Sequence, residues 1–282
     1  MNNQSICSVL ALLLLVGTVS ADQLSLDADK DSGFFAAVDN GTIIPTPNNF
    51  GAHTHVPVAS ANNLRLNRSV FEFDLSTIPS GVTVTSATFV FEVTAQGGPN
   101  GQAAADFGLH QVTSSWDEGT GTSNIGGATG DGVTWSMRTA TEAWNVLGGD
   151  FDAAVIDSTN VAGPGTFSLS SSSLVSVVQD MVDGTVANNG FLMKAVTEGI
   201  PGSAARVTTR EGGTPAQLLV TFSDGTLLLG DVNGDGAFNL LDVSPFVDLI
   251  VSGGFSCEGD VNEDGSVDLL DVAPFIDLIS GG

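Results

Sequence analysis

Short stretches in which apolar and polar residues alternate recur along the first two hundred residues of the chain. In Ser69–Leu75, Phe71, Phe73 and Leu75 occupy every second position, so they share one face of an extended strand. Val82–Val93 follows a Pro-Ser-Gly turn and is rich in β-branched and aromatic residues, as is typical of a strand. The other predicted strands are Phe107–Val112, Thr166–Leu169, Gly190–Val196, Arg206–Thr209 and Leu218–Phe222.

One segment has helical periodicity instead, because its apolar residues recur three or four positions apart. These residues are Leu174, Val177, Val178 and Met181. Gly184 supplies a stop signal for this helix. Many short strands joined by long loops favour a mainly β fold, a two-sheet sandwich of the jelly-roll type. Thr113–Phe167 is predicted to be mostly loop.

The net charge of the chain limits the classes of partner that it can bind. Its 282 residues include 7 Lys and Arg against 32 Asp and Glu, for a formal net charge of -25. Nucleic acid is excluded as a partner because binding phosphates needs a basic face. The same charge disfavours anionic membranes and polyanionic ligands.

The start of the chain indicates export. Leu10–Val16 is an apolar run, and Val19-Ser20-Ala21 has the small residues of a cleavage site. The run is too short to span a bilayer, so residues 1–21 are predicted to be a signal peptide. No other segment approaches the length of a membrane span. We therefore expect a protein that is secreted or at the cell surface.

Residues 68–88, RSVFEFDLSTIPSGVTVTSAT, resemble the opening of the secreted bacterial DNRLRE-type β-sandwich domain. Further pieces follow in the same order: Ser115–Gly119, Gly130–Trp135, Trp144–Phe151, Asn188–Phe191 and Thr209–Glu211. That family is similar to carbohydrate-binding modules attached to polysaccharide lyases. The resemblance implies a non-catalytic jelly roll over residues 22–223, with a polysaccharide as its partner.

The last fifty residues contain an internal duplication. Gly230–Ile250 recurs as Gly259–Ile279, at an offset of 29 residues. No Lys or Arg follows Arg210, whereas eleven acidic residues lie between Asp231 and Asp277. This change in composition predicts a boundary near residue 224, a linker over 224–229 and a second module over 230–282.

Each copy of the repeat has the pattern of a calcium loop, with D-x-N-x-D-G at positions 1 to 6 and Asp at position 12. Calcium prefers several hard oxygen ligands, and glycine at position 6 permits the sharp turn that gathers them. Position 7 contributes its backbone carbonyl. The predicted ligands are Asp231, Asn233, Asp235, Ala237, Asn239 and Asp242 in the first loop, and Asp260, Asn262, Asp264, Ser266, Asp268 and Asp271 in the second.

A short helix is predicted after each loop, with Pro245 and Pro274 in the first turns. The apolar faces expected to pack together are Phe246, Leu249 and Ile250 with Phe275, Leu278 and Ile279. This small all-α, EF-hand-like pair resembles the type I dockerin over residues 230–282. The resemblance implies calcium-dependent docking onto a cohesin-like surface protein. Positions 10 and 11 of each loop are leucines, where dockerins often carry small hydroxyl residues.

Three functions remain open. We favour a non-catalytic binding or scaffolding protein. The rival is a carbohydrate-active enzyme, a polysaccharide hydrolase or lyase, with its site in the 113–167 loops, where Asp117, Glu118 and Glu142 are the candidate acids. The third is a purely structural surface protein.

Several weaker candidates are interpreted as structural. His53 and His55 lack an obvious third metal ligand. Asp27, Asp29 and Asp31 alternate near the start of the sandwich, and we favour a solvated face over an ion site. The three tryptophans are interpreted as core residues rather than as a platform for sugars.

Overall fold

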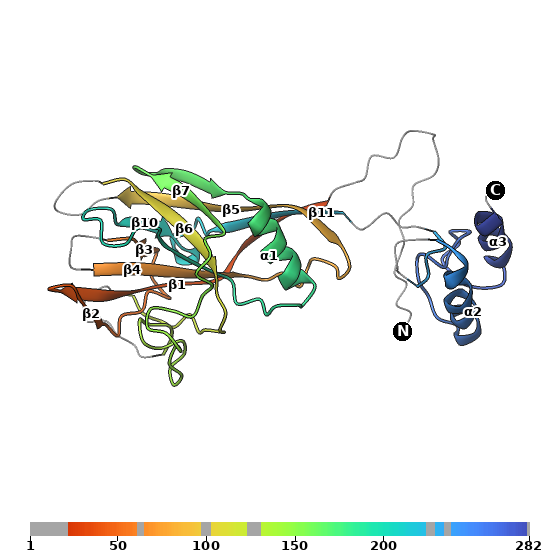
Figure 1. The fold of residues 1–282 in the computed structure, drawn as a ribbon, viewed down its shortest axis with the longest axis horizontal. Coiled ribbons are helices and arrows are strands. Elements are labelled where there is room, and N and C mark those ends of the chain that lie inside the picture. Colours follow the sequence, from red (N-terminus) through yellow and green to blue (C-terminus); the bar gives the residue numbers. More distant parts are fainter. Residues whose placement is uncertain are drawn as a thin grey trace. The chain divides into compact units, whose positions relative to one another are not determined.

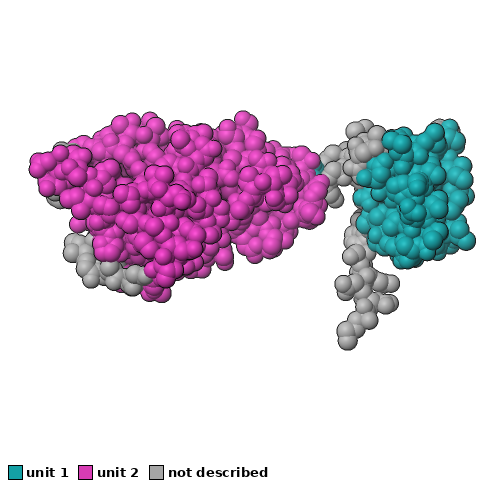
Figure 2. Space-filling view, turned by 60° about the horizontal axis from the view of Figure 1, so that its bottom comes forward, with its two compact units in different colours: residues 1–20, 223–282 teal, residues 21–222 magenta. Residues whose placement is uncertain are grey.

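The computed structural model describes residues 22–60, 65–96, 103–122, 131–223, 229–233 and 238–280, whose helices and strands are labelled in Figure 1. They fall into two compact units, one formed by residues 21–222 and the other containing 223–282 (Figure 2). The predicted signal peptide and positions 224–228 of the predicted linker lie outside the described residues. Within the described ranges, no helix has the length and apolar character needed to cross a membrane.

The first unit is mainly β and is built on a large antiparallel sheet (Figure 1). Its strands are β1 (Asp22–Asp39), β2 (Thr42–Pro45), β3 (His55–Val58), β4 (Arg65–Phe73), β5 (Thr83–Gln96), β6 (Ala105–Gln111), β7 (Asp157–Val161), β8 (Gly165–Leu169), β9 (Phe191–Ala195), β10 (Ala205–Thr208) and β11 (Gln217–Ser223). The strand order is β3-β10-β5-β11-β1-β4-β9-β6-β7, with β2 paired to β1 and β8 paired to β5.

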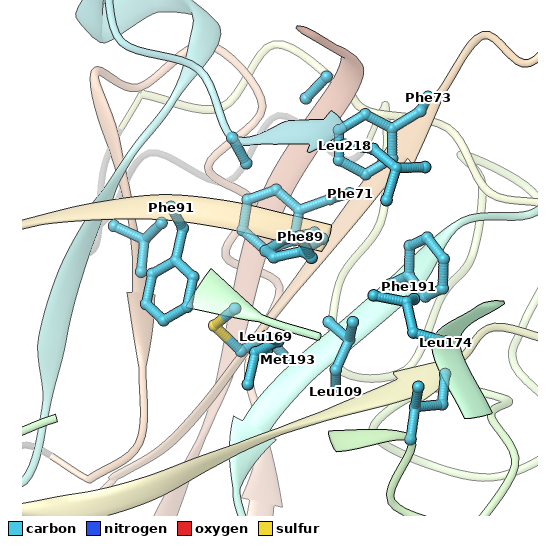
Figure 3. Packing of buried hydrophobic residues seen from close by; sticks show 14 of the residues in the cluster. Phe71, Phe73, Phe89, Phe91, Leu109, Leu169, Leu174, Phe191, Met193 and Leu218 are labelled. Carbon is cyan, nitrogen blue, oxygen red and sulfur yellow. The ribbon is translucent and has the colours of Figure 1, made fainter. Parts of the chain in front are cut away.

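The long strand β1 joins the two halves of this sheet. Its first residues pair with β11, and from Ala28 onward it pairs with β4 after a register shift between Ala28 and Lys30. Strands β4 and β5 are not paired, yet Phe71 and Phe73 of β4 lie 5.5 and 5.7 Å from the ring of Phe89 in β5. The two halves therefore face each other across an apolar core, as in a β-sandwich (Figure 3).

Each of the seven predicted strands and the predicted helix is present in the first unit. Helix α1 (Ser172–Val182) begins at Ser171, whose side chain accepts a hydrogen bond from the backbone N–H of Leu174. Gln179 attaches the helix to the start of β5, because its amide bonds the backbone of both Val82 and Val84. Strands β1, β2, β3 and β7 were not predicted.

The segment between β6 and β7 has no named helix or strand in its described part, as predicted, but it is not merely surface loop. All three tryptophans of the chain lie in it and are buried against the outer face of β1, β4 and β9. The ring of Trp135, for example, lies 6.1 Å from that of Phe34. The loop thus supplies a second core, and its buried indoles cannot stack on a sugar.

The second unit contains a 3-10 turn (Leu240–Asp242) that leads into α2 (Val243–Ser252), and a second helix, α3 (Val272–Ser280). Phe246 of α2 and Phe275 of α3 stack with their ring centroids 3.9 Å apart and their planes 5° apart. The predicted helices and their apolar contact are confirmed for these two residues. The expectation for Leu278 is wrong, because its side chain is 43% exposed.

Candidate metal-binding sites

The last aspartate of the first loop closes that loop through its backbone. Asp242 is completely buried, and its two oxygens accept hydrogen bonds from the N–H groups of Asn233 (3.0 Å) and Asn239 (2.8 Å). The side chain of Asn239 accepts from the N–H of Leu241 at 2.8 Å, which starts the turn into α2. Loop positions 3, 9 and 12 are thereby tied together. The predicted ligands Asp235 and Ala237 lie outside the described residues.

The second loop repeats this arrangement at the same positions. Asp271 is completely buried and accepts from the N–H groups of Asn262 (3.0 Å) and Asp268 (2.9 Å). Asp268 accepts from the N–H of Leu270 at 2.7 Å, as Asn239 does in the first loop. The duplication seen in the sequence is therefore a duplication of local structure.

The start of the second loop turns around its first aspartate. The two oxygens of Asp260 accept from the N–H groups of Asp264 (3.0 Å) and Gly265 (2.8 Å). Gly265 has a φ of +90°, which confirms the left-handed turn predicted at position 6. Asp264 in turn accepts from the N–H of Ser266 at 3.0 Å.

The donor chemistry of both loops fits calcium, because their side chains offer carboxylate and amide oxygens. Asp231, Asp242, Asp260 and Asp271 are all buried, and the chain has no Lys or Arg beyond Arg210 to offset their charge. Among the described residues, however, the loop carboxylates form no group of three with oxygens within 4.8 Å of one another. Asp242, Asp260 and Asp271 accept backbone N–H groups, and calcium ligation stays a prediction.

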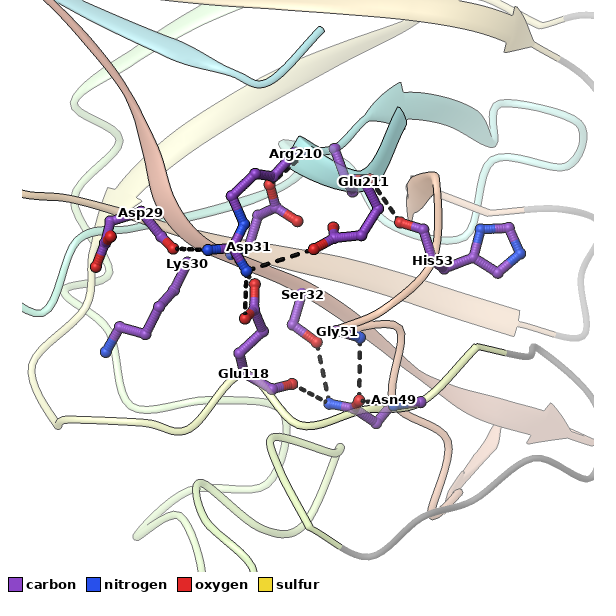
Figure 4. Close-up of polar contacts among 12 residues, drawn as sticks. Asp29, Lys30, Asp31, Ser32, Asn49, Gly51, His53, Glu118, Arg210 and Glu211 are labelled. Atoms are coloured by element: carbon purple, nitrogen blue, oxygen red, sulfur yellow. Dashed lines mark hydrogen bonds and ion pairs between the residues drawn. The ribbon is translucent and has the colours of Figure 1, made fainter. Parts of the chain in front are cut away.

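A different acidic cluster is present in the first unit (Figure 4). Asp31 lies in β1, Glu118 in the loop after β6, and Glu211 in the 3-10 turn Arg210–Gly212. One oxygen from each carboxylate lies within 4.8 Å of the others. Sequence reasoning missed this cluster, although Glu118 and Glu211 each lie in a segment that carries the DNRLRE resemblance.

Arg210 holds the cluster together. Its Nη2 lies 2.7 Å from Oε2 of Glu118 and 3.4 Å from Oε1 of Glu211. Its Nη1 donates to the backbone oxygen of Asp29 at 2.5 Å, and its backbone N–H donates to Oδ2 of Asp31 at 2.9 Å. One arginine thus contacts all three carboxylates and the strand that carries Asp31.

Asp31 is completely buried, so its interpretation as part of a solvated face is wrong. The register shift between Ala28 and Lys30 is the reason, because a bulge reverses which residues of a strand point inward. Burial raises the pKa of Asp31 to about 7, and the hydrogen bond from the backbone of Arg210 only partly offsets this. Burial also raises the pKa of Glu118. Asp27 and Asp29 are exposed, as expected.

Asn49 holds the backbone of Glu118 in place. It is completely buried, and its Nδ2 lies 2.6 Å from the carbonyl oxygen of Glu118 and 2.8 Å from that of Val133. Its Oδ1 accepts from the N–H groups of Gly51 (3.0 Å) and Gly121 (2.9 Å). A Cβ at Gly121 would collide with the backbone of Asn49, so this close approach needs glycine.

The other candidates are not members of this cluster. The rings of His53 and His55 are 4.1 Å apart, and burial lowers the pKa of both, that of His55 to about 4. No third His, Cys, Asp or Glu forms a metal group with them among the described residues. Glu142 pairs with Arg138 at 2.8 Å rather than joining Glu118.

No protein-family model matches the chain, and no curated protein matches it. The function therefore has to be argued from the geometry of the two units and their acidic sites.

Proposed function

We propose that the chain is a secreted, non-catalytic binding or scaffolding protein with a DNRLRE-type jelly roll over 22–223 and a dockerin-like module over 230–282. In this proposal, calcium holds the C-terminal module folded so that it can dock a surface protein. The observation that carries the proposal is the matched closure of the two loops. In each loop, the buried aspartate at position 12 accepts the N–H groups of positions 3 and 9.

The excess of acidic residues in the module is the reason that the proposal includes a cation. Eleven acidic residues lie between Asp231 and Asp277, with no basic residue among them. The first and last aspartates of each loop are nevertheless buried. Burying several carboxylates in a module that has no Lys or Arg is unfavourable, and the small core around Phe246 and Phe275 offers little to offset that cost. Calcium would supply the missing positive charge and couple its binding free energy to folding.

Exposed leucines support a protein as the docking partner. Leu240, Leu241, Leu269 and Leu270 are between 66% and 77% exposed. They occupy positions 10 and 11 of both loops, so each repeat presents the same apolar pair. Single exposed leucines are common, but two matched pairs indicate an interaction surface. A cohesin-like partner with an apolar docking face fits this chemistry.

The sandwich is better supported as a scaffold than as an enzyme. Its three tryptophans are buried, so they cannot provide a stacking platform for a polysaccharide. Asp31 has a raised pKa and two acidic neighbours, yet it is completely buried and therefore cannot contact a polymer. Polysaccharide binding by this unit would have to use polar contacts on its surface.

The proposal is tested with the chain lacking residues 1–21. Far-ultraviolet circular dichroism in chelator and then in excess calcium should show helical signal that appears with the metal. The double change Asp231→Ala and Asp260→Ala should abolish this gain. Asp248→Ala changes an aspartate on α2 outside the loops and is the matched control. Helical signal of equal size in chelator would refute the calcium requirement.

Docking is tested separately by calorimetry against a panel of purified cohesin domains in calcium. The variant with Leu269→Ser and Leu270→Ser should bind more weakly, while keeping its calcium-dependent helical signal. If no member of the panel binds the calcium-loaded chain, the cohesin-like partner is refuted and the calcium module stands alone.

A further inference from the structure

One carboxylate oxygen of Asp31 lies buried in the sandwich without a hydrogen-bond donor from the residues that the structure describes. Oδ2 of Asp31 accepts the N–H of Arg210, but Oδ1 is buried and has no partner among the described residues. A buried charged oxygen without a partner is strongly unfavourable and calls for a counter-ion or a proton. In Figure 4 this oxygen points toward the carboxylate of Glu211.

The charges around this oxygen do not balance. Three carboxylates, from Asp31, Glu118 and Glu211, share the single guanidinium of Arg210. The nearby Lys30 does not help, because its ammonium pairs with Glu72 at 2.8 Å and bonds the carbonyl of Trp116. With all three acids ionised, the cluster therefore carries two uncompensated negative charges.

The geometry of the cluster suits a small hard cation. Carboxylate oxygens of a calcium site lie about 2.3–2.6 Å from the ion, so two of them can be separated by up to about 5 Å. The three oxygens here lie within 4.8 Å of one another. The donors are all oxygens, which favours calcium, magnesium or manganese over zinc or copper.

The side chains of the cluster differ in how much of each is exposed to solvent. The side chains of Arg210 and Glu211 are 42% and 29% exposed, that of Glu118 is 18% exposed, and Asp31 is completely buried. Glu211 thus gives the cluster a side that faces solvent, whereas Asp31 is too deeply buried to contact a sugar. The solvent-facing side of Glu211 leaves positions for water as further ligands.

We propose that Asp31, Glu118 and Glu211 form a divalent cation site that joins β1, the loop after β6 and the Arg210–Gly212 turn. The site is separate from the two C-terminal loops and belongs to a different unit. Its role is to fasten three segments that are distant in the sequence. The competing explanation is a proton on Asp31 that is shared with Glu211, and the experiment distinguishes the two.

Tryptophan fluorescence reports on the sandwich and not on the C-terminal module, because all three tryptophans lie in the sandwich and none lies beyond residue 222. Thermal unfolding of the full chain is followed at pH 7.5 in chelator, and then in calcium, magnesium or manganese chloride. A site filled at about 100-fold excess over its Kd should raise the sandwich Tm by about 5–10 °C with at least one of these ions.

Single substitutions show which side chains the rise in Tm depends on. Asp31→Asn and Glu211→Gln should each abolish the rise in Tm. Asp29→Asn removes the same charge from the same strand at an exposed position, and it should keep the rise. The rise should also persist when Asp231→Ala and Asp260→Ala disable the C-terminal loops, which separates this site from the proposed docking module.

Three outcomes would overturn the proposal. The first is a wild-type sandwich Tm that none of the three cations changes, which leaves the shared proton as the explanation. The second is a rise in Tm that Asp31→Asn and Glu211→Gln both retain, since the ion would then bind elsewhere. The third is a rise that is lost when only the C-terminal loops are disabled.

Discussion

Replacing Asp31 with asparagine should stabilise the sandwich at alkaline pH when no metal is present. The amide oxygen of asparagine can accept the backbone N–H of Arg210, as Oδ2 of Asp31 does now. Its Nδ2 would take the place of Oδ1, which has no donor in the described part of the chain, and could donate to the carboxylate of Glu211. The substitution keeps the shape of the side chain and removes the buried charge.

The magnitude follows from the titration of Asp31. Burial raises the pKa of this carboxyl to about 7 in the folded chain, whereas an unfolded aspartate titrates near ~3.9. The folded state therefore holds the proton more tightly, so stability falls as the pH rises from about 4 to about 7. Above both values the loss is about 4 kcal/mol, at about 1.4 kcal/mol for each pKa unit.

Asparagine should recover about 2–4 kcal/mol of this loss at pH 8, because an amide is a weaker acceptor than a carboxylate. For a unit of this size, that gain corresponds to a rise in Tm of about 5–15 °C. At pH 5 the carboxyl of Asp31 is still protonated in the folded state, while the unfolded one is ionised, so the loss has reached only about 1.5 kcal/mol. Asparagine should therefore stabilise the sandwich by at most about 1.5 kcal/mol at this pH.

The assay is thermal unfolding in chelator at pH 5 and pH 8, followed by tryptophan fluorescence, which reports the sandwich. Asp29→Asn, on the exposed face of β1, is the control and should change the Tm little at either pH. The reasoning is refuted if Asp31→Asn lowers the Tm at pH 8, or if its effect is the same at both pH values.

Three further predictions concern other parts of the chain. Asn49→Ala should lower the free energy of unfolding of the sandwich by about 3 kcal/mol, measured by denaturant titration, because it removes several buried hydrogen bonds; a loss below about 1 kcal/mol would contradict its central role. Phe246→Ala should destabilise the second unit by about 3–5 kcal/mol and reduce its helical signal in calcium, since it removes the ring stacked on Phe275; unchanged signal and melting would count against this packing. Gly265→Ala should weaken calcium binding by the second loop about tenfold in calorimetry, because a left-handed φ costs alanine about 1–2 kcal/mol; equal affinity would argue against the turn.

The strands that the sequence predicts are those in which packing produces a local pattern. In β4, Phe71 and Phe73 alternate because one face of the strand lies on the core. The long strand β1 lacks such a pattern near Asp31, because the irregularity after Ala28 breaks the alternation. Strand β2 is exposed along its whole length, so burial imposes no periodicity on it.

The two kinds of acidic site also differ in whether a local sequence pattern marks them. The two C-terminal loops could be predicted because the residues of each lie within twelve positions of one another, and their spacing is that of a calcium loop. Asp31, Glu118 and Glu211 come from three distant segments and meet only when β1, the loop after β6 and the Arg210 turn are folded together. No spacing in the sequence predicts that these three side chains lie close together, so only the tertiary structure reveals the cluster.

The pairing of β1 with β11 also determines how the sandwich would respond to a pulling force. Asp22 lies opposite Phe222 in this antiparallel pair, so the chain enters and leaves the unit at the same point of the sheet. A pull on these two ends would load the hydrogen bonds one pair at a time, starting at Asp22 and Phe222, rather than all together. The sandwich should therefore unzip at low force when it is stretched between its ends, while a load applied across the middle of β1 would meet many bonds at once.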